Sequence, residues 1–249
     1  MKKTIKTSCA IAATLLCISS SVFAENSGHG KPCYGLPSHN QLQTALKAAR
    51  NADNGGFDLD MWASIVNRDG FVCAVAFSGA DRNSQWPGSR VIAAQKAYTA
   101  NAFSLDGLAL STANLYAATQ PGGSLFGLQH SNPVATDRAY DGNPLRYGTD
   151  KDPMVGKKVG GVNVFGGGLA LYANGKVIGA VGVSGDSSCA DHNIAWRTRD
   201  TLGLDALPGG VGTPGDNIIF DLTNPFGHPT CNAVSQSAND AVIVDAPLN

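Results

Sequence analysis

Apolar runs separated by glycine-rich turns predict a β-hairpin followed by a helix in the second half of the chain. Asn174-Gly175 lies between two apolar runs, and this dipeptide in that position is typical of a hairpin closed by a type I′ turn. The second run, residues 176–183, leads directly into residues 184–188, where small and N-capping residues predict a helix start. A helix start carries unpaired backbone N–H groups, which can bind a carboxylate or phosphate. The candidate ligand-binding residues at this place are Ser184, Gly185 and Ser187.

The same patterns predict the other elements and the fold class. In chain order they are a helix over residues 38–52, strands over 62–66 and 71–77, helices over 89–103 and 105–118, an irregular region over 128–161, the hairpin, a helix that ends near residue 204, and a coil-rich tail with one strand-like run over 217–222. Two hairpins separated by helices predict an α+β fold, in which helices pack on the faces of a central antiparallel β-sheet. A long irregular region inside a compact domain is usually functional or mobile.

The first residues have the pattern of an export signal. Three lysines within the first six residues precede an apolar run over residues 9–18, and residues 22–24 (Val-Phe-Ala) have the small-residue spacing of a cleavage site. This pattern predicts a Sec-type signal peptide that is cleaved after Ala24. The apolar run is too short for a transmembrane span, and no later stretch is long and apolar enough to form one. We therefore expect an exported protein, periplasmic or secreted.

Composition argues against nucleic-acid binding. The net charge is −1, and no basic stripe is interleaved with aromatic residues. Charged residues make up 15% of the chain, against about 25% in an average soluble protein. The 30 glycines exceed the usual share. Low charge and abundant glycine fit a turn-rich exported protein with one large domain, with or without extensions.

Four cysteines remain after the predicted signal: Cys33, Cys73, Cys189 and Cys231. In an oxidising compartment they suggest two disulfides, for which three pairings exist. We expect Cys33–Cys73 and Cys189–Cys231, because each pair ties a terminal extension to an element of the core. The alternative to the second disulfide is a zinc site, to which His192 and His228 would add two imidazoles. With the disulfide, these histidines are expected as surface or capping residues.

Familiar catalytic motifs do not occur in the sequence. The run of residues 182–185 resembles a nucleophile elbow, but Asp186 stands where that motif needs a glycine. The three glycines at 166–168 are not followed by Gly-Lys-Ser/Thr, so they do not form a P-loop. No acid–base pair or triad is recognisable. Whether the protein is an enzyme stays open at this point.

Polar residues that follow the first hairpin are candidate ligand contacts. Arg82 can pair with a carboxylate through two hydrogen bonds, and Lys96 lies on the next helix. On that helix Tyr98 or Thr99 can offer oxygen to a metal. The alternative interpretation is a simple turn at Asp81-Arg82 and an exposed helix charge at Lys96.

Two histidines are candidate ligands for a heme iron, because neutral imidazole is a common axial ligand. His130 lies in the irregular region, and His192 follows the predicted helix start. The alternative for a histidine in a loop is a solvated side chain.

Several of these segments together resemble the GlcG/HbpS heme-binding family. They are Asp69-Gly70, residues 79–82 (GADR), residues 96–100 (KAYTA) and residues 175–185 (GKVIGAVGVSG). The resemblance covers roughly residues 37–204 and implies a profilin-like fold for that domain. Residues 25–36 and 205–249 then form an N-terminal and a coil-rich C-terminal extension.

The resemblance implies binding of heme or a related tetrapyrrole, with heme or iron-linked sensing or slow heme degradation in some members. It also implies assembly as a homo-oligomer. Within the matched motifs it favours Arg82, Lys96 and Thr99 as contacts. The chain departs from the family pattern in its cysteine-bearing extensions, in the lengthened 129–161 region and in residues 189–192.

Three functional hypotheses follow. The first is an exported protein that binds heme or another small anionic ligand, with Arg82, Lys96 and the N–H groups of residues 184–187 contacting its carboxylates. The second is an enzyme that acts on heme or on a small organic acid. The third is a structural oligomer whose ligand pocket has been lost.

Overall fold

The computed structural model describes residues 32–249, and in that range four strands form one antiparallel sheet. The predicted signal peptide lies outside the described residues. The strands are β1 (Trp62–Asn67), β2 (Val72–Phe77), β3 (Gly168–Ala173) and β4 (Lys176–Ser184), in the order β2-β1-β4-β3. The α-helices of the described residues are α1 (His39–Arg50), α2 (Ser89–Phe103), α3 (Tyr116–Thr119), α4 (Leu128–Ser131), α5 (Thr136–Ala139), α6 (Ser188–Thr201) and α7 (Ser235–Asp245).

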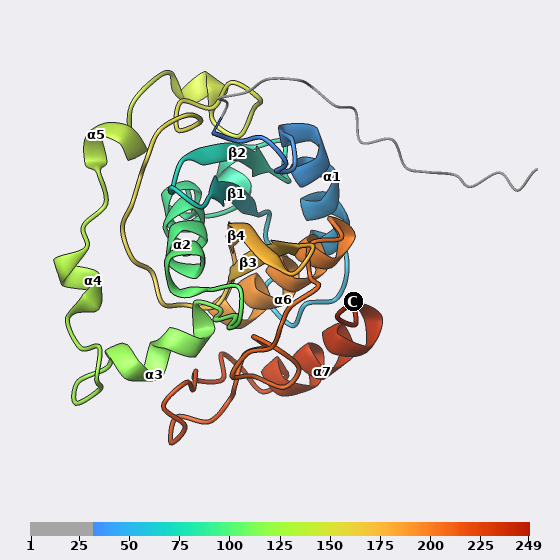
Figure 1. Ribbon diagram of the computed structural model, residues 1–249. Helices are drawn as coiled ribbons and strands as arrows, with labels where there is room; N and C mark the ends of the chain where they lie inside the picture. Colours follow the sequence, from blue (N-terminus) through green and yellow to red (C-terminus); the bar gives the residue numbers. More distant parts are fainter. Residues whose placement is uncertain (1–31) are drawn as a thin grey trace, which may run out of the picture. The chain divides into compact units, whose positions relative to one another are not determined.

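Helices cover both faces of the sheet. Figure 1 shows α2 on one side, and α1 and α6 on the other. Both faces are apolar: Ile65 and Val181 pack toward α1 and α6, whereas Val75 and Ala180 pack toward α2. The predicted α+β fold with helices on the faces of an antiparallel sheet is therefore confirmed.

The backbone of α2 lies directly against β4. A Cβ atom added at Gly182 would lie 2.0 Å from the carbonyl oxygen of Ala93 and 2.4 Å from the backbone nitrogen of Ala97. Real Cβ atoms do not approach other atoms this closely, so only glycine fits at this position. The small side chains of the alanine-rich α2 and the glycine-rich β4 thus allow the helix and the strand to pack closely.

Local signals in the sequence explain several element boundaries. Ser38 and Gln41 form a capping box at the start of α1, and Leu42 and Leu46 bury its apolar face. The predicted helix over residues 89–103 is α2 itself.

Two predicted elements are wrong. Residues 105–118 do not form a helix: they contain a turn, a short 3₁₀ segment (Ala113–Leu115) and only the start of α3. The reason is that hydroxyl and amide side chains bond the local backbone, as when Ser104 Oγ accepts from Leu110 N at 3.1 Å and Asn114 Oδ1 accepts from Ser111 N at 3.0 Å.

The strand-like run over 217–222 is not a strand either. Its Ile218 N–H donates to the ring of His192 at 3.2 Å instead of to a neighbouring strand. The tail, which was expected to be mostly coil, also contains α7, which packs Val242 into the core on the α6 side.

Both expected disulfides are present. Cys33 bonds Cys73 with an S–S distance of 2.07 Å, which fixes the N-terminal segment to β2. Cys189 bonds Cys231 at 2.04 Å, which fixes the C-terminal tail to the first turn of α6. In residues 32–249, no helix has the length and apolar character needed to cross a membrane.

The β3–β4 turn gives a clean test of backbone strain. Gly175 has φ +71°, and no atom lies within 4 Å of a Cβ added there. Gly175→Ala should therefore lower the free energy of unfolding by about 1–2 kcal/mol through left-handed strain alone. The measurement is urea unfolding followed by circular dichroism.

Gly107→Ala is the matched control, because Gly107 has equal space around it and no positive φ. Alanine there should leave stability unchanged or raise it slightly. An equal loss in both variants would contradict the assignment of the effect to the turn.

Candidate functional site

One end of the sheet gathers most of the predicted ligand-binding residues. Trp62 at the start of β1 pairs with Phe77 at the end of β2 and with Ser184 at the end of β4. The segment carrying Arg82 leaves β2 at this end, and the segment leading into α6 leaves β4 here too. Predicted residues that are distant in sequence therefore share one edge of the sheet.

A small pocket opens at this end beside Arg82. Its volume is about 50 Å³. The lining residues come from β1, from the β2–α2 connection, from the first turn of α2 and from the long loop after α5; they are Trp62, Arg82, Gln85, Pro87, Arg90, Val91, Tyr140 and Tyr147.

Asp152 holds the walls of this pocket together. Its carboxylate accepts hydrogen bonds from the Arg90 guanidinium (Nε–Oδ2 2.8 Å) and from the backbone N–H of Gly148 at 2.8 Å and Met154 at 2.9 Å. Arg90 also donates to the carbonyl oxygen of Ala139 at 2.9 Å. A buried, bidentate ion pair thus joins α2 to the lengthened region of the chain.

Two guanidinium groups flank the ring of Tyr147. The Arg90 Cζ lies 3.7 Å from the ring centroid and the Arg82 Cζ lies 5.6 Å from it. Arg90 is buried and paired, whereas Arg82 is exposed at the rim. Tyr147 thereby orients the Arg82 side chain by a cation–π contact.

Lys96 lies in the interior and pairs with Asp191. Its side chain crosses the end of β4, so that Nζ lies 2.6 Å from Asp191 Oδ2 and donates to the carbonyl oxygen of Val183 at 3.2 Å. Lys96 is 1% exposed, so the interpretation as an exposed helix charge is wrong. Burial lowers the pKa of Lys96 and raises the pKa of Asp191 to about 6, and the attraction between the two groups opposes both shifts.

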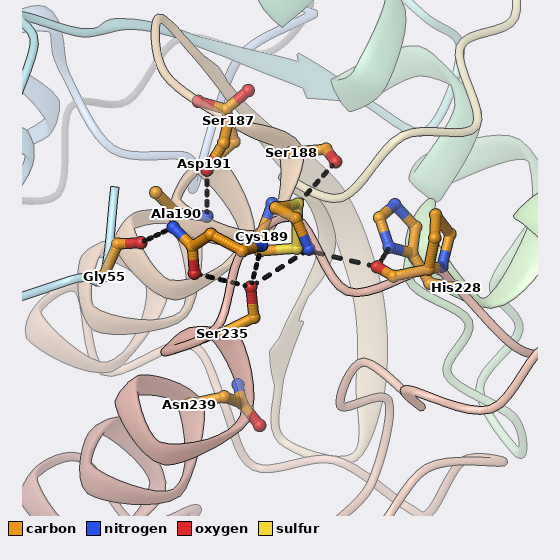
Figure 2. The surroundings of a disulfide bond; sticks show 12 residues. Gly55, Ser187, Ser188, Cys189, Ala190, Asp191, His228, Ser235 and Asn239 are labelled. Carbon is orange, nitrogen blue, oxygen red and sulfur yellow. Dashed lines mark hydrogen bonds between the residues drawn. A yellow bond between two sulfur atoms is a disulfide. The ribbon is translucent and has the colours of Figure 1, made fainter. Parts of the chain in front are cut away.

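Backbone N–H groups at the start of α6 already donate hydrogen bonds to acceptors within the chain. Figure 2 shows the first turn of α6 beside the disulfide. The Cys189 N–H donates to Cys231 Sγ at 3.1 Å, the Ala190 N–H donates to Ser187 Oγ at 3.4 Å, and the Asp186 N–H donates to Asp191 Oδ1 at 2.9 Å. An external anion at this helix start would have to displace these groups.

The remaining predicted residues at this helix start are also enclosed. Ser184 and Gly185 are buried, and a Cβ added at Gly185 would lie 2.4 Å from the carbonyl oxygen of Asp60. Ligand binding by Ser184, Gly185 and Ser187 stays a prediction.

His192 and His228 are fully buried, so their assignment as surface or capping residues is wrong. The Ile218 N–H donates to His192 Nε2 at 3.2 Å, and the His228 Nδ1 lies 2.7 Å from the carbonyl oxygen of Pro229. Burial lowers the pKa of His192 to about 3 and that of His228 to about 4. Both rings are therefore neutral at pH 7.

The zinc alternative does not form, because the sulfurs of Cys189 and Cys231 are bonded to each other. Nor does the described part of the chain place three histidine, cysteine or acidic side chains together as a metal site.

The other candidates differ in how accessible they are. Thr99 is buried, and its Oγ1 both donates to the Gln95 carbonyl at 2.8 Å and accepts from the Asn163 N–H at 3.0 Å. Tyr98 is half-buried on the same helix, and His130 is exposed on α4. Among the predicted iron ligands, His130 and Tyr98 are within reach of a ligand, and His192 and Thr99 are not.

Sequence reasoning missed Asp191, Asp152, Gln85 and the two tyrosines of the pocket. Asp191 lies in the first turn of α6, where an acidic residue is a recognisable sign of a helix start. Its pairing with a lysine 95 positions away has no local signal. The loop residues around the pocket have none either.

A family comparison decides what this domain is related to. Residues 38–199, which make up more than half of the chain, match the family model described as "Haem degrading protein HbpS-like". The chain belongs to the HbpS-like family. The match begins at the cap of α1 and ends within α6, so it contains the whole sheet and the pocket.

Individual relatives give weaker likenesses. An uncharacterized 15.0 kDa protein in the dhaT-dhaS intergenic region of Citrobacter freundii is 36% identical over 109 residues, which is 44% of this chain and 55% of that protein. The chain thus spans about half the length of this curated relative.

Three solved structures match parts of this chain. The Klebsiella pneumoniae protein ORFY matches with 25% identity and a TM-score of 0.45, over 66% of this chain and 86% of that one. A PduOC:heme complex matches with 25% identity and a TM-score of 0.46, over 65% and 89%. A double mutant of Streptomyces reticuli HbpS matches with 16% identity and a TM-score of 0.42, over 80% and 99%.

The buried histidines predict how stability depends on pH. Their folded pKa values of about 3 and about 4 lie below the ordinary value of 6.5. As pH falls below about 6.5, the unfolded chain binds protons that the folded chain does not, so each histidine lowers the free energy of unfolding by about 1.4 kcal/mol per pH unit. The loss continues until the pH reaches the folded pKa.

We expect each of two substitutions, His192→Asn and His228→Asn, to make the free energy of unfolding depend less steeply on pH. Between about pH 6 and 4.5 the slope should fall by about 1.4 kcal/mol per pH unit in each variant. The measurement is guanidinium unfolding at a series of pH values. His130→Gln, which removes an exposed imidazole, is the control and should keep the parent slope. An unchanged slope in the His192 and His228 variants would contradict burial of these rings.

Proposed function

We propose that this protein binds heme or a related tetrapyrrole. The observation that carries the proposal is the match of residues 38–199 to a family described as haem degrading. One of the solved structures that match this chain is a PduOC:heme complex.

The pocket beside Arg82 is too small to enclose a tetrapyrrole. A pocket that encloses a drug-sized ligand has a volume of about 300–1,000 Å³, whereas the pocket beside Arg82 has about 50 Å³. A macrocycle therefore does not fit inside this pocket, which can hold at most one of its substituents.

Several solvent-accessible side chains have groups that can bind heme. His130 offers an exposed imidazole as an iron ligand, and Phe126, four residues earlier, is 61% exposed and offers apolar surface. Arg82 offers an exposed guanidinium for a propionate, and Tyr98 offers a phenol as a second candidate iron ligand. The bound group would supply a redox-active iron.

The family description favours one second candidate function, the slow degradation of heme. Degradation and simple binding give different results when the heme-loaded protein is mixed with a reductant and oxygen. If heme is degraded, the Soret band disappears and a bilin is released. Stable heme under these conditions would favour binding alone.

Export and self-association belong to the same proposal. Disulfides at Cys33–Cys73 and Cys189–Cys231 support an oxidising compartment such as the periplasm or the exterior. The intact mass of protein recovered from the periplasm would show cleavage after Ala24, and light scattering would show a homo-oligomer.

The test of heme binding is a titration of the purified mature protein with hemin. The expected result is a saturable Soret shift at micromolar hemin, and His130→Ala should weaken binding by about ten-fold or more, as expected when an axial ligand is lost. Gln129→Ala, on the same short helix, is the matched control and should bind hemin like the parent.

The possible results separate the two parts of the proposal. The absence of any saturable shift would contradict heme binding. A parent-like shift in His130→Ala would exclude His130 as the ligand, and Tyr98→Phe would then test the other accessible candidate.

A further inference from the structure

The two disulfides close loops of nearly equal length. Cys33 and Cys73 are 40 residues apart in the sequence, and Cys189 and Cys231 are 42 residues apart. In the chain-entropy model, the stabilisation that a disulfide provides depends on the length of the loop it closes, so this contribution is nearly the same for both bonds. A difference in how readily the two bonds are reduced therefore comes from the surroundings of their sulfur atoms.

The sulfur of Cys231 lies among hydrogen-bond donors. The Cys189 N–H donates to it at 3.1 Å, and Ser188 Oγ lies 3.3 Å away (Figure 2). A disulfide sulfur carries no proton, so the Ser188 hydroxyl is the donor in the second contact. Both donors belong to the first turn of α6, where the helix carries partial positive charge. These groups stabilise a thiolate on Cys231 once the disulfide is reduced.

Two of the other sulfurs lie beside carbonyl oxygens instead. Cys189 Sγ is 3.7 Å from the carbonyl oxygen of Pro229, and Cys73 Sγ is 3.5 Å from that of Phe71. A carbonyl oxygen accepts a hydrogen bond from a thiol and disfavours a thiolate. The Cys189–Cys231 pair thus has a place for one thiolate and one thiol. For the Cys33–Cys73 pair, the described residues supply an acceptor and no donor.

The two cysteines at the start of α6 also differ in accessibility. Cys231 is exposed in the segment before α7, whereas Cys189 is 2% exposed. Thiol–disulfide exchange depends on access to the sulfur that is attacked. A thiolate from solution therefore reaches Cys231 before Cys189.

We propose that Cys189–Cys231 is a redox-active disulfide that exchanges with dithiols through Cys231. The thiolate of a singly deprotonated dithiol attacks Cys231 Sγ, the S–S bond to Cys189 breaks, and a mixed disulfide forms. The Cys189 sulfur takes the proton of the second thiol of the reductant. That second sulfur then attacks the first, which closes a cyclic disulfide and releases Cys231 as a thiolate. Two electrons pass from the dithiol to the protein, with no net change in protons.

Contacts other than the disulfide hold the C-terminal tail against α6. The Trp196 indole N–H donates to the carbonyl oxygen of Ala246 at 2.8 Å, and the Asn239 amide donates to Asn193 Oδ1 at 2.8 Å. Val242 of α7 is buried in the core. The tail therefore keeps its place when the bond is broken, and the two sulfurs stay close enough to be oxidised again.

The test is equilibration of the purified mature protein, without oxygen, in buffers with different ratios of reduced to oxidised dithiothreitol. Free thiols are then trapped with a maleimide, and peptide mass spectrometry gives the reduced fraction of each disulfide. Cys189–Cys231 should be half reduced at a ratio at least about ten-fold lower than Cys33–Cys73, which corresponds to about 30 mV. Protein in which only Cys189–Cys231 is reduced should keep the circular dichroism spectrum of the parent.

The pH dependence of alkylation identifies the thiolate. In the reduced protein, Cys231 should reach half its maximal rate with iodoacetamide below about pH 8.5, the value for an ordinary cysteine thiol. Ser188→Ala removes the hydroxyl donor, so this midpoint should move to higher pH and reduction should need about three-fold more reduced dithiothreitol or more.

Two variants control for other effects of the substitution. Ser188→Thr keeps a hydroxyl at the same place and should restore the parent midpoint. Thr201→Ala removes an exposed hydroxyl at the opposite end of α6 and should leave both measurements unchanged. A shift in Thr201→Ala equal to that in Ser188→Ala would contradict a specific role of the Ser188 hydroxyl.

Four further results would overturn the proposal. They are half-reduction of Cys33–Cys73 at an equal or lower ratio, a Cys231 midpoint at or above about pH 8.5, an unchanged midpoint in Ser188→Ala, and loss of the folded spectrum on reduction. The proposal goes beyond heme binding and does not rest on it, because its groups belong to α6 and the C-terminal tail. The reduction experiment contains no hemin, so the two proposals fail separately.

Discussion

The direct contact between α2 and β4 is the constraint on which the rest of the structure depends. Gly182 has no side chain, so the backbone of Ala93 and Ala97 rests on the strand. From this position on the sheet, the Lys96 side chain of α2 reaches Asp191 and the Arg90 side chain reaches Asp152. The close approach at Gly182 thus holds α2 on the sheet, and α2 carries one partner of the interior ion pair and part of the pocket wall.

The Lys96–Asp191 pair joins the two layers of helices at the end of the sheet. Lys96 comes from α2 and Asp191 from α6, and both are buried. Loss of one partner of such a pair leaves a charge buried without compensation, which costs about 3–5 kcal/mol. The pair therefore belongs to the framework of the domain. Accessible ligand chemistry is left to Arg82 at the pocket rim, Tyr98 on α2 and His130 on α4.

Sequence reasoning succeeded where the signal is local. The Asn174-Gly175 turn, the Ser38 cap and the alanine-rich helix each depend on a few neighbouring residues. It failed for residues 105–118 because serine and asparagine side chains took over backbone hydrogen bonds there. For the candidate site, it found Arg82 but not Gln85, which has no feature of its own in the sequence.

The sequence by itself determined the hairpins, the main helices and the fold class, because turns, caps and periodicity act over a few residues. The disulfide pairing was one of three that the sequence allows, and the structure confirmed it. Only the tertiary structure decided which polar residues face a ligand. It placed Lys96, Thr99 and His192 in the interior and brought Trp62 and Gln85 to one pocket. The physical reason is that burial and pairing depend on contacts between residues far apart in the chain.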